Sequence, residues 1–286
     1  MTLRAPAAAA LAALLAASAA GAQTLRTLSS SRQLHGESAL TADITYVAGR
    51  FRLYAAAPGA LYQMDLRYDE DKFTPIRDYD AAAGTLHLGL KTHGHVTLAG
   101  HRDGEDVPTL DLGLAPGVPL ALSIDLGAAE ADADFGGLAL RTLTYHTGAS
   151  KSALRFSRPN PVDCDSLTVE AGAAQLTATG LGNANCRHVK VDGGVGVVTL
   201  DFTGKWRGSV DATANVAFGT LNLRLPRNLG VAITLSRFLA SFDQSGFTRR
   251  GDAYYSDNYA SAPYHLDLTA SSAFGGIQVI WLDDSR

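Results

Sequence analysis

The chain has 286 residues, a formal net charge of −4 and no block of basic residues, which argues against nucleic acid as a partner. Only 18% of the residues are charged and glycine occurs 29 times, a composition typical of a β-rich protein with many tight turns and unlike that of a disordered chain. The length allows one large β domain or two smaller units.

The N-terminus has the pattern of a secretory signal peptide. Arg4 supplies a positive charge, residues 7–20 are almost wholly apolar, and residues 20–22 are the small residues that a signal peptidase requires. The alternative is an uncleaved anchor helix, for which the apolar run is short. We predict a signal peptide over residues 1–22 and an exported protein, in the periplasm, on the cell surface or secreted. No integral membrane span is expected after cleavage, because no later segment is long and apolar enough.

Residues 23–117 are predicted to form a small antiparallel β unit. Alternating apolar residues indicate strands at 44–47, 49–54, 61–68 and 85–90. Turn residues at 56–59 predict a hairpin between the second and third of these strands. We expect the unit to end near residues 116–119.

Histidines near the end of this unit are the best candidates for a metal site. His93 and His95 would face the same side of a strand, and His101 or Asp103 could add a third ligand. Solvated histidines on an exposed edge are the simpler interpretation, so we expect no metal and no other cofactor.

Glycines recur at intervals of 21 to 25 residues in the remainder of the chain, and these intervals predict a β-solenoid domain over residues 118–286. The repeated positions are Gly127, Gly148, Gly172, Gly194, Gly219 and Gly275, with Ser241 as a degenerate copy. Apolar residues alternate between the glycines, which indicates short strands with one buried face. Stacked coils would bury the faces that no coil can bury alone. The open ends of such a stack would favour self-association.

The stretch VDGGVGVVTLDF (residues 191–202) could be a phosphate-binding loop, a calcium-binding turn or a bend between strands. A phosphate loop requires a following Lys-Ser/Thr pair and a helix, which are missing here. A calcium β-roll requires an aspartate where this chain has Val198. We therefore interpret the stretch as a solenoid corner, where glycines allow close approach of neighbouring backbones.

Cys164 and Cys186 are the two cysteines of the chain. Export to an oxidising compartment makes a disulfide between them plausible, and two separate buried thiols are the alternative. Neither cysteine has the local histidine and acid motif of a catalytic nucleophile.

Five aspartates lie between apolar residues and are predicted to point outward, one from each coil: Asp111, Asp125, Asp201, Asp211 and Asp267. Stacked carboxylates could act as an acid/base pair in a polysaccharide-active β-helix enzyme. No cluster of basic and aromatic residues accompanies them, so solvated charges are the simpler interpretation. The Gly-x-Ser-x-Gly and His-Glu-x-x-His motifs are absent as well, so we predict no enzyme activity.

An insertion before the last repeat carries three tyrosines and two arginines: Arg249, Arg250, Tyr254, Tyr255 and Tyr259. Both residue types are common in binding hot spots, so the insertion is a candidate recognition loop. The alternative is a loop that packs over the coil and covers an open edge.

Several segments resemble the toast-rack family of bacteria, which includes extracellular domains of LiaF-type and phage-shock-type envelope-stress proteins. They are AGRFRLYAAAPGALYQMDLRYDEDKFTPIRDYDAAAGTLHLG (48–89), LDFTGKW (200–206), FGTLNLRLPRNLGV (218–231), YYSDNYASAPYHLDL (254–268) and the FGGI that begins at Phe274. The resemblance covers most of residues 43–283. It implies an all-β solenoid without enzyme activity that binds or senses envelope components or scaffolds a partner, in an envelope-stress response. Many relatives carry transmembrane helices that this chain lacks, which puts direct control of a membrane kinase in doubt.

Overall fold

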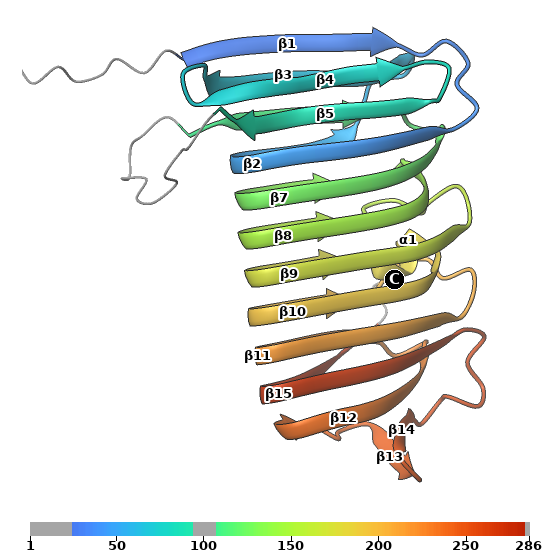
Figure 1. Ribbon diagram of the computed structural model, residues 1–286. Coiled ribbons are helices and arrows are strands. Elements are labelled where there is room, and N and C mark those ends of the chain that lie inside the picture. The colour runs from blue at the N-terminus through green and yellow to red at the C-terminus, as the bar shows by residue number, and fades with distance from the viewer. Residues whose placement is uncertain (1–24, 94–106, 284–286) are drawn as a thin grey trace, which may run out of the picture.

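The computed structural model describes residues 25–93 and 107–283, without the side chains of 237–240. The predicted signal peptide and His95, His101 and Asp103 lie outside the described residues. Within them, a single fifteen-stranded sheet and one four-residue helix account for the regular structure (Figure 1). The all-β prediction is therefore confirmed. In the same part of the chain, no helix is long and apolar enough to cross a membrane.

The strands are β1 (Leu25–Gln33), β2 (Leu40–Ala55), β3 (Ala60–Asp69), β4 (Phe73–Asp80), β5 (Thr85–Thr92), β6 (Thr109–Leu114), β7 (Pro119–Asp134), β8 (Ala139–Arg155), β9 (Cys164–Thr179), β10 (Cys186–Asp201), β11 (Val210–Pro226), β12 (Gly230–Phe242), β13 (Phe247–Arg250), β14 (Ala253–Ser256) and β15 (His265–Leu282), and the helix is α1 (Leu181–Ala184).

Eight long strands form the solenoid. They stack in parallel in the order β2, β7, β8, β9, β10, β11, β15, β12. Each strand makes one rung and wraps around the same edge of the molecule, as Figure 1 shows. The side chains between the two halves of the rungs form one continuous apolar core. This arrangement is the predicted β-solenoid.

Every rung turns a corner without interrupting its strand. In β7 the buried residues are even-numbered up to Leu126 and odd-numbered from Ala129 onward, so the core-facing side changes at Gly127. The stretch 191–202 of β10 does the same between Val191 and Val198. The corner interpretation is thus correct, but the expected short strands are wrong. Ladder hydrogen bonds continue through the corner and give strands of 16 or 17 residues in β7 to β11. Below, the front face is formed by the strand halves before the corner, and the back face by the halves after it.

Glycine occupies the corner because neighbouring backbones approach too closely for a side chain. A Cβ on Gly194 would lie 2.6 Å from the carbonyl oxygen of Gly172. From β10 onward the tightest position moves two residues along the strand, where Gly196, Gly219 and Gly275 have φ near +140° and clash in the same way with the rung before. The alignment of Gly194 with Gly219 is therefore wrong, since Gly219 pairs with Gly196.

The last rung of the sequence does not lie at the end of the stack. β15 lies between β11 and β12 and pairs in parallel with both. Its Phe274 and Gly275 match Phe218 and Gly219 of β11, and the two phenylalanine rings stack at 5.1 Å between centroids. β12 carries Ala240 in place of the glycine. The rung that packs against the tight corner of β11 is thus β15, which has a glycine at the same position.

The strands before residue 117 are arranged differently from the prediction. β2 pairs in parallel with β7 over most of its length, so it is already a rung of the solenoid. It also pairs in parallel with β5 and β6, and only the pairs β1–β3, β3–β6 and β4–β5 are antiparallel. The expected hairpin is wrong, because β6 lies between β2 and β3. The division of the chain at residue 117 stays a prediction, and the sheet is continuous across it.

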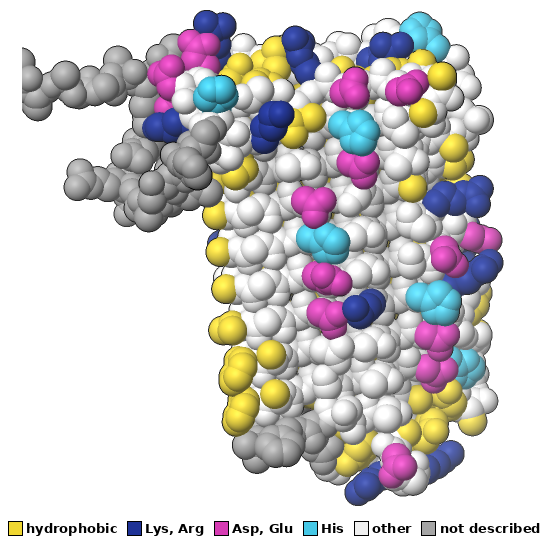
Figure 2. All heavy atoms as spheres, in the orientation of Figure 1, with side chains coloured by type: hydrophobic (Ala, Val, Ile, Leu, Met, Phe, Trp, Pro, Cys, Tyr) yellow, Lys and Arg dark blue, Asp and Glu magenta, His cyan; other side chains and the backbone are white. Residues whose placement is uncertain are grey.

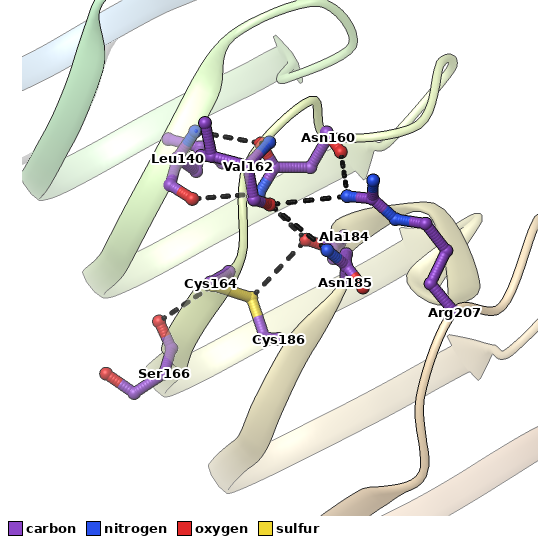
Figure 3. Close-up of a disulfide and its surroundings, with 9 residues drawn as sticks. All are labelled: Leu140, Asn160, Val162, Cys164, Ser166, Ala184, Asn185, Cys186 and Arg207. Atoms are coloured by element: carbon purple, nitrogen blue, oxygen red, sulfur yellow. Dashed lines mark hydrogen bonds between the residues drawn. A yellow bond between two sulfur atoms is a disulfide. The ribbon is translucent and has the colours of Figure 1, made fainter.

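A disulfide joins the first residues of β9 and β10, Cys164 and Cys186 (Figure 3). Of the two states that the sequence leaves open, the structure has the bonded one. Beside it, the buried side chain of Asn160 donates to the carbonyl oxygens of Leu140 and Ala184 at 2.8 and 3.0 Å. Arg207 donates to the carbonyl oxygen of Asn160 at 2.5 Å. These contacts tie successive rungs together at the edge where the loops lie.

Loss of the disulfide is expected to lower the free energy of unfolding by about 3 kcal/mol, because the bond closes a loop between residues 22 positions apart. Urea unfolding with and without a reductant measures this difference. The double variant Cys164→Ala/Cys186→Ala is the control and should no longer respond to the reductant. Equal stability of the oxidised and reduced wild type would contradict the prediction.

Substitution of Gly219 by alanine is expected to cost roughly 3 kcal/mol or more, because it combines a left-handed φ with a backbone clash. Gly117→Ala shares the positive φ but meets open space, and should cost only about 1 kcal/mol. Gly208→Ala, which has neither feature, should stay within about 0.5 kcal/mol of wild type. Thermal and urea unfolding of the three variants give the comparison, and a Gly219→Ala variant as stable as Gly208→Ala would refute the explanation of the corner.

Candidate functional site

A groove of about 470 Å³ crosses the front face near the β12 end of the stack. Its floor consists of two rows of side chains that are in register across five strands. One row is Ser166, His188, Asp211, Asp267 and Ala232; the other is Thr168, Lys190, Thr213, Thr269 and Thr234. Parallel strands lie about 4.8 Å apart, so the second row presents a polar group at that spacing from all five strands, and the first row does so from every strand except β12, where Ala232 stands. We call this site the front groove.

The front face sorts its side chains into columns because the rungs are in register. Figure 2 shows acidic and histidine side chains gathered in columns along this face. In the column nearer the corner, Nδ1 of His146 lies 3.0 Å from Oδ1 of Asp125 and donates to this carboxylate when Nδ1 carries the proton. In the same column, Asn215 donates to Asp192 at 2.7 Å. The front groove follows the columns farther from the corner.

Asp211 and Asp267 are register neighbours in the front groove. The hydroxyl of Tyr259 donates to Asp267 at 2.8 Å, which fixes this carboxylate in place. The Asp211 side chain is 74% exposed, and Nδ1 of His188 lies 3.8 Å from its carboxylate. The pair therefore offers one fixed and one solvated carboxylate, both able to accept hydrogen bonds from a ligand.

The tyrosine-rich insertion closes one end of the front groove. Its strands β13 and β14 form a hairpin that pairs with β12 and covers that edge, as the alternative interpretation of the loop expected. Tyr255 lies opposite Ala232 and lines the groove, where Ala232 leaves room beside the ring. Tyr259 meets Tyr255 edge to face at 5.0 Å between ring centroids.

The five residues of the predicted recognition loop do not act as a set. Tyr254 is buried and packs on Phe242 at 5.0 Å, so it cannot offer its ring to a ligand. Arg249 lies beside Tyr254, with its guanidinium carbon 5.8 Å from that ring centre. Arg250 lies beside Tyr255 instead, at 5.7 Å. The alternation of β14 separates neighbouring tyrosines onto opposite faces.

Asp125, Asp211 and Asp267 are exposed as predicted, but the prediction is wrong for Asp201 and the five aspartates do not form one column. Asp201 is buried, 3.5 Å from Arg224, and accepts a hydrogen bond from the backbone of Thr203. Asp111 lies on β6, in register with Arg52 and Asp65. Asp125 belongs to the other column of the front face. Only Asp211 and Asp267 come together, because the insertion of β15 beside β11 makes them neighbours.

The second row of the front groove, which consists of four threonines and Lys190, was not identified from the sequence. Its members occupy equivalent positions in successive rungs, two residues after Ser166, His188, Asp211, Asp267 and Ala232. Their repetition was a usable signal for β9 to β11. The sequence does not predict that Thr269 belongs to this row, because its position depends on where β15 lies in the stack.

The histidine cluster predicted as a candidate metal site is only partly described. His93 follows β5, and the other three residues lie outside the described ranges. Among the described residues, no three or more His, Cys, Asp or Glu side chains are placed to hold a metal ion.

Trp206 packs against Phe202 and donates to its carbonyl oxygen at 3.0 Å.

Comparisons with known proteins give a family and a fold. The family described as the N-terminal domain of toast_rack, DUF2154, matches residues 21–177. A Clostridium sporogenes structure provisionally assigned to cell adhesion is 16% identical, with a TM-score of 0.52 over 90% of this chain and 100% of that one. A Bacteroides fragilis structure provisionally assigned as an adhesin is 11% identical, with a TM-score of 0.39 over 89% and 97%, too low to support a common arrangement. No curated protein matches the chain.

Burial and the bond to Asp267 raise the pKa of Tyr259 to about 12. The un-ionised phenol therefore stabilises the fold fully below pH 10, and this contribution is lost as the pH rises from about 10 to 12. In Asp267→Asn the neighbouring negative charge is gone, so the pKa of Tyr259 should fall toward 10. The pKa is measured from the tyrosinate absorbance as a function of pH. The spectrum of the matching Tyr259→Phe variant is subtracted, both for the wild type and for Asp267→Asn. An unchanged pKa in Asp267→Asn would contradict the assigned contact.

Proposed function

The chain belongs to the toast-rack family, and from this premise we propose that it is an exported, non-catalytic protein that binds a component of the cell envelope through the front groove. The observation that carries the proposal is the pair of polar rows that ends at Tyr255. A role in the envelope-stress response, which the family resemblance implies, is part of the proposal.

The chemistry of the groove favours a glycan as the bound component. Carboxylates accept hydrogen bonds from sugar hydroxyls, and threonine hydroxyls both accept and donate them. The half-buried Tyr255 ring offers an apolar surface with a polar tip. The rows extend across five strands, so they can contact successive units of a linear polymer. Asp211 and Asp267 would repel an acidic polymer. A neutral or amino-sugar glycan therefore fits best.

Export is supported by two independent features. Residues 1–22 have the pattern of a signal peptide. The Cys164–Cys186 disulfide is of a kind that persists in oxidising compartments. The provisional assignment of the Clostridium sporogenes protein to cell adhesion agrees with a binding role at the surface, although the likeness to it is one of fold.

Self-association through the solenoid ends would involve β1 or β13, the two ends of the main strand order. β13 has four residues, two of them the arginines Arg249 and Arg250, and short charged edges resist strand addition. β1 has nine residues, most of them exposed and polar, and pairs with β3. We therefore place any end-to-end contact at β1.

A polysaccharide-active enzyme is the second candidate, and the pairing of Asp211 with Asp267 is the observation in its favour. General acid catalysis requires a carboxyl group that keeps its proton, usually in an apolar pocket. Asp211 and Asp267 are both exposed, so neither lies in such a pocket, and Asp267 is already held by the hydroxyl of Tyr259. Both features favour binding over catalysis.

The test is co-sedimentation of the protein with purified cell envelopes and with insoluble neutral and amino-sugar glycans. We expect Tyr255→Ala and Asp267→Asn each to weaken binding by about tenfold or more, because the first removes the aromatic surface of the groove and the second removes a charged hydrogen-bond acceptor. Asp125→Asn is the matched control, since it makes the same change on the same face outside the groove. Wild-type binding that survives both groove substitutions would refute the site.

The same preparations separate the two candidate functions. Pectin, alginate and peptidoglycan are incubated with the protein, and new reducing ends are measured. The binding proposal predicts none. Turnover by the wild type that disappears in Asp211→Asn and Asp267→Asn would establish the enzyme instead.

A further inference from the structure

The back face carries a second hollow, far along the stack from the front groove and on the other side of the core. It has a volume of about 390 Å³ and is lined by residues of β6, β2, β7, β8 and β9. We propose that this back pocket binds a short peptide segment that carries both carboxylate and amine groups. The proposal does not depend on the front groove.

Charges of alternating sign cross the back pocket, one strand after another. β6 contributes Asp111, β2 contributes Arg50 and Arg52, β7 contributes Glu130 and Asp132, and β8 contributes Lys151. The pairing register makes Arg52 the neighbour of both Asp111 and Asp132, and Glu130 the neighbour of both Arg50 and Lys151. Each band lies about 4.8 Å from the next.

These neighbours do not close onto one another. In the part of the chain that the structure describes, Asp132 is bound by Arg155 at 2.5 Å, whereas no ion pair or side-chain hydrogen bond involves Arg50, Glu130, Lys151 or Asp111. On the front face, the corresponding neighbours are in contact, as with Asp125 and His146 at 3.0 Å or His146 and Glu170 at 3.6 Å. Opposite charges in register normally attract. Here they surround a cavity, and their unused hydrogen-bonding capacity is available to a ligand.

The lining of the pocket selects the chemistry of that ligand. Ala153 lines it beside the charges and is partly exposed, so part of the contact surface is apolar. Arg50 and Arg52 suit carboxylates, which guanidinium groups bind in bidentate fashion. Glu130 and Asp111 suit ammonium groups and would repel an acidic glycan or nucleic acid. A peptide that carries both carboxylate and ammonium groups can pair with the basic and the acidic side chains of the pocket, whereas a neutral glycan leaves these side chains without an ionic partner.

The probe is the tetrapeptide Ala-Glu-Lys-Ala with free termini, titrated into the full protein by calorimetry. Ala-Gln-Gln-Ala with blocked termini is the neutral control, and free glutamate and lysine test whether single amino acids suffice. We expect saturable binding of the charged tetrapeptide that weakens as salt is raised, because the contacts are between charges at the surface. The neutral peptide and the single amino acids should bind at least tenfold more weakly.

Arg50→Gln and Glu130→Gln should each weaken tetrapeptide binding by about tenfold, whereas Arg187→Gln, which removes an exposed arginine of the front half of β10, should leave it unchanged. Circular dichroism of each variant checks that it is folded. Equal binding of charged and neutral peptides, or full binding by both pocket variants, would overturn the proposal. Envelope co-sedimentation of Arg50→Gln should match wild type, so failure of the back pocket and failure of the front groove are distinguishable.

Discussion

The close approach of neighbouring backbones at the solenoid corner is the constraint on which the rest of the structure depends. Neighbouring rungs pair in the same register on both sides of each corner, so a rung cannot slip relative to its neighbours on one face without slipping on the other. At Gly196, Gly219 and Gly275 a side chain would strike the carbonyl oxygen of the rung before. The glycines thus lock the register of the front and back faces together.

Locked register is what converts a repetitive sequence into functional surfaces. Equivalent residues of successive rungs fall into straight columns, so a binding surface is assembled from one residue per rung and needs no long loop. The front groove places Asp211 beside Asp267 and Thr213 beside Thr269 in this way. The back pocket places Arg50 beside Glu130 by the same rule. In the column of the front face nearer the corner, the register neighbours contact each other, whereas in the front groove and the back pocket they line a cavity.

The amino-acid sequence predicts the architecture better than the sites. The spacing of Gly127, Gly148 and Gly172 predicts the solenoid, because each of these glycines lies where the backbone of the neighbouring rung leaves no room for a side chain. It does not predict that the tight position moves by two residues in β10, since Gly194 and Gly196 are both glycines and only the contact between rungs distinguishes them. β2 was missed as a rung because its partner β7 begins after four intervening strands. Pairs such as Asp211 and Asp267 depend on the order of the stack, which local patterns do not contain.

The hairpin β13–β14 shows how one insertion can serve stability and binding together. It takes the chain away from β12 and lets β15 return between β11 and β12, where its Phe-Gly pair meets that of β11. It then covers residues 232–234 at the outer edge of β12, which would otherwise be open to pairing with another chain. Strand alternation sends Tyr254 into the core as an anchor and Tyr255 into the front groove. The front groove therefore ends at the paired part of β12. Tyr255, which forms this end, is positioned by its neighbour Tyr254, which packs in the core.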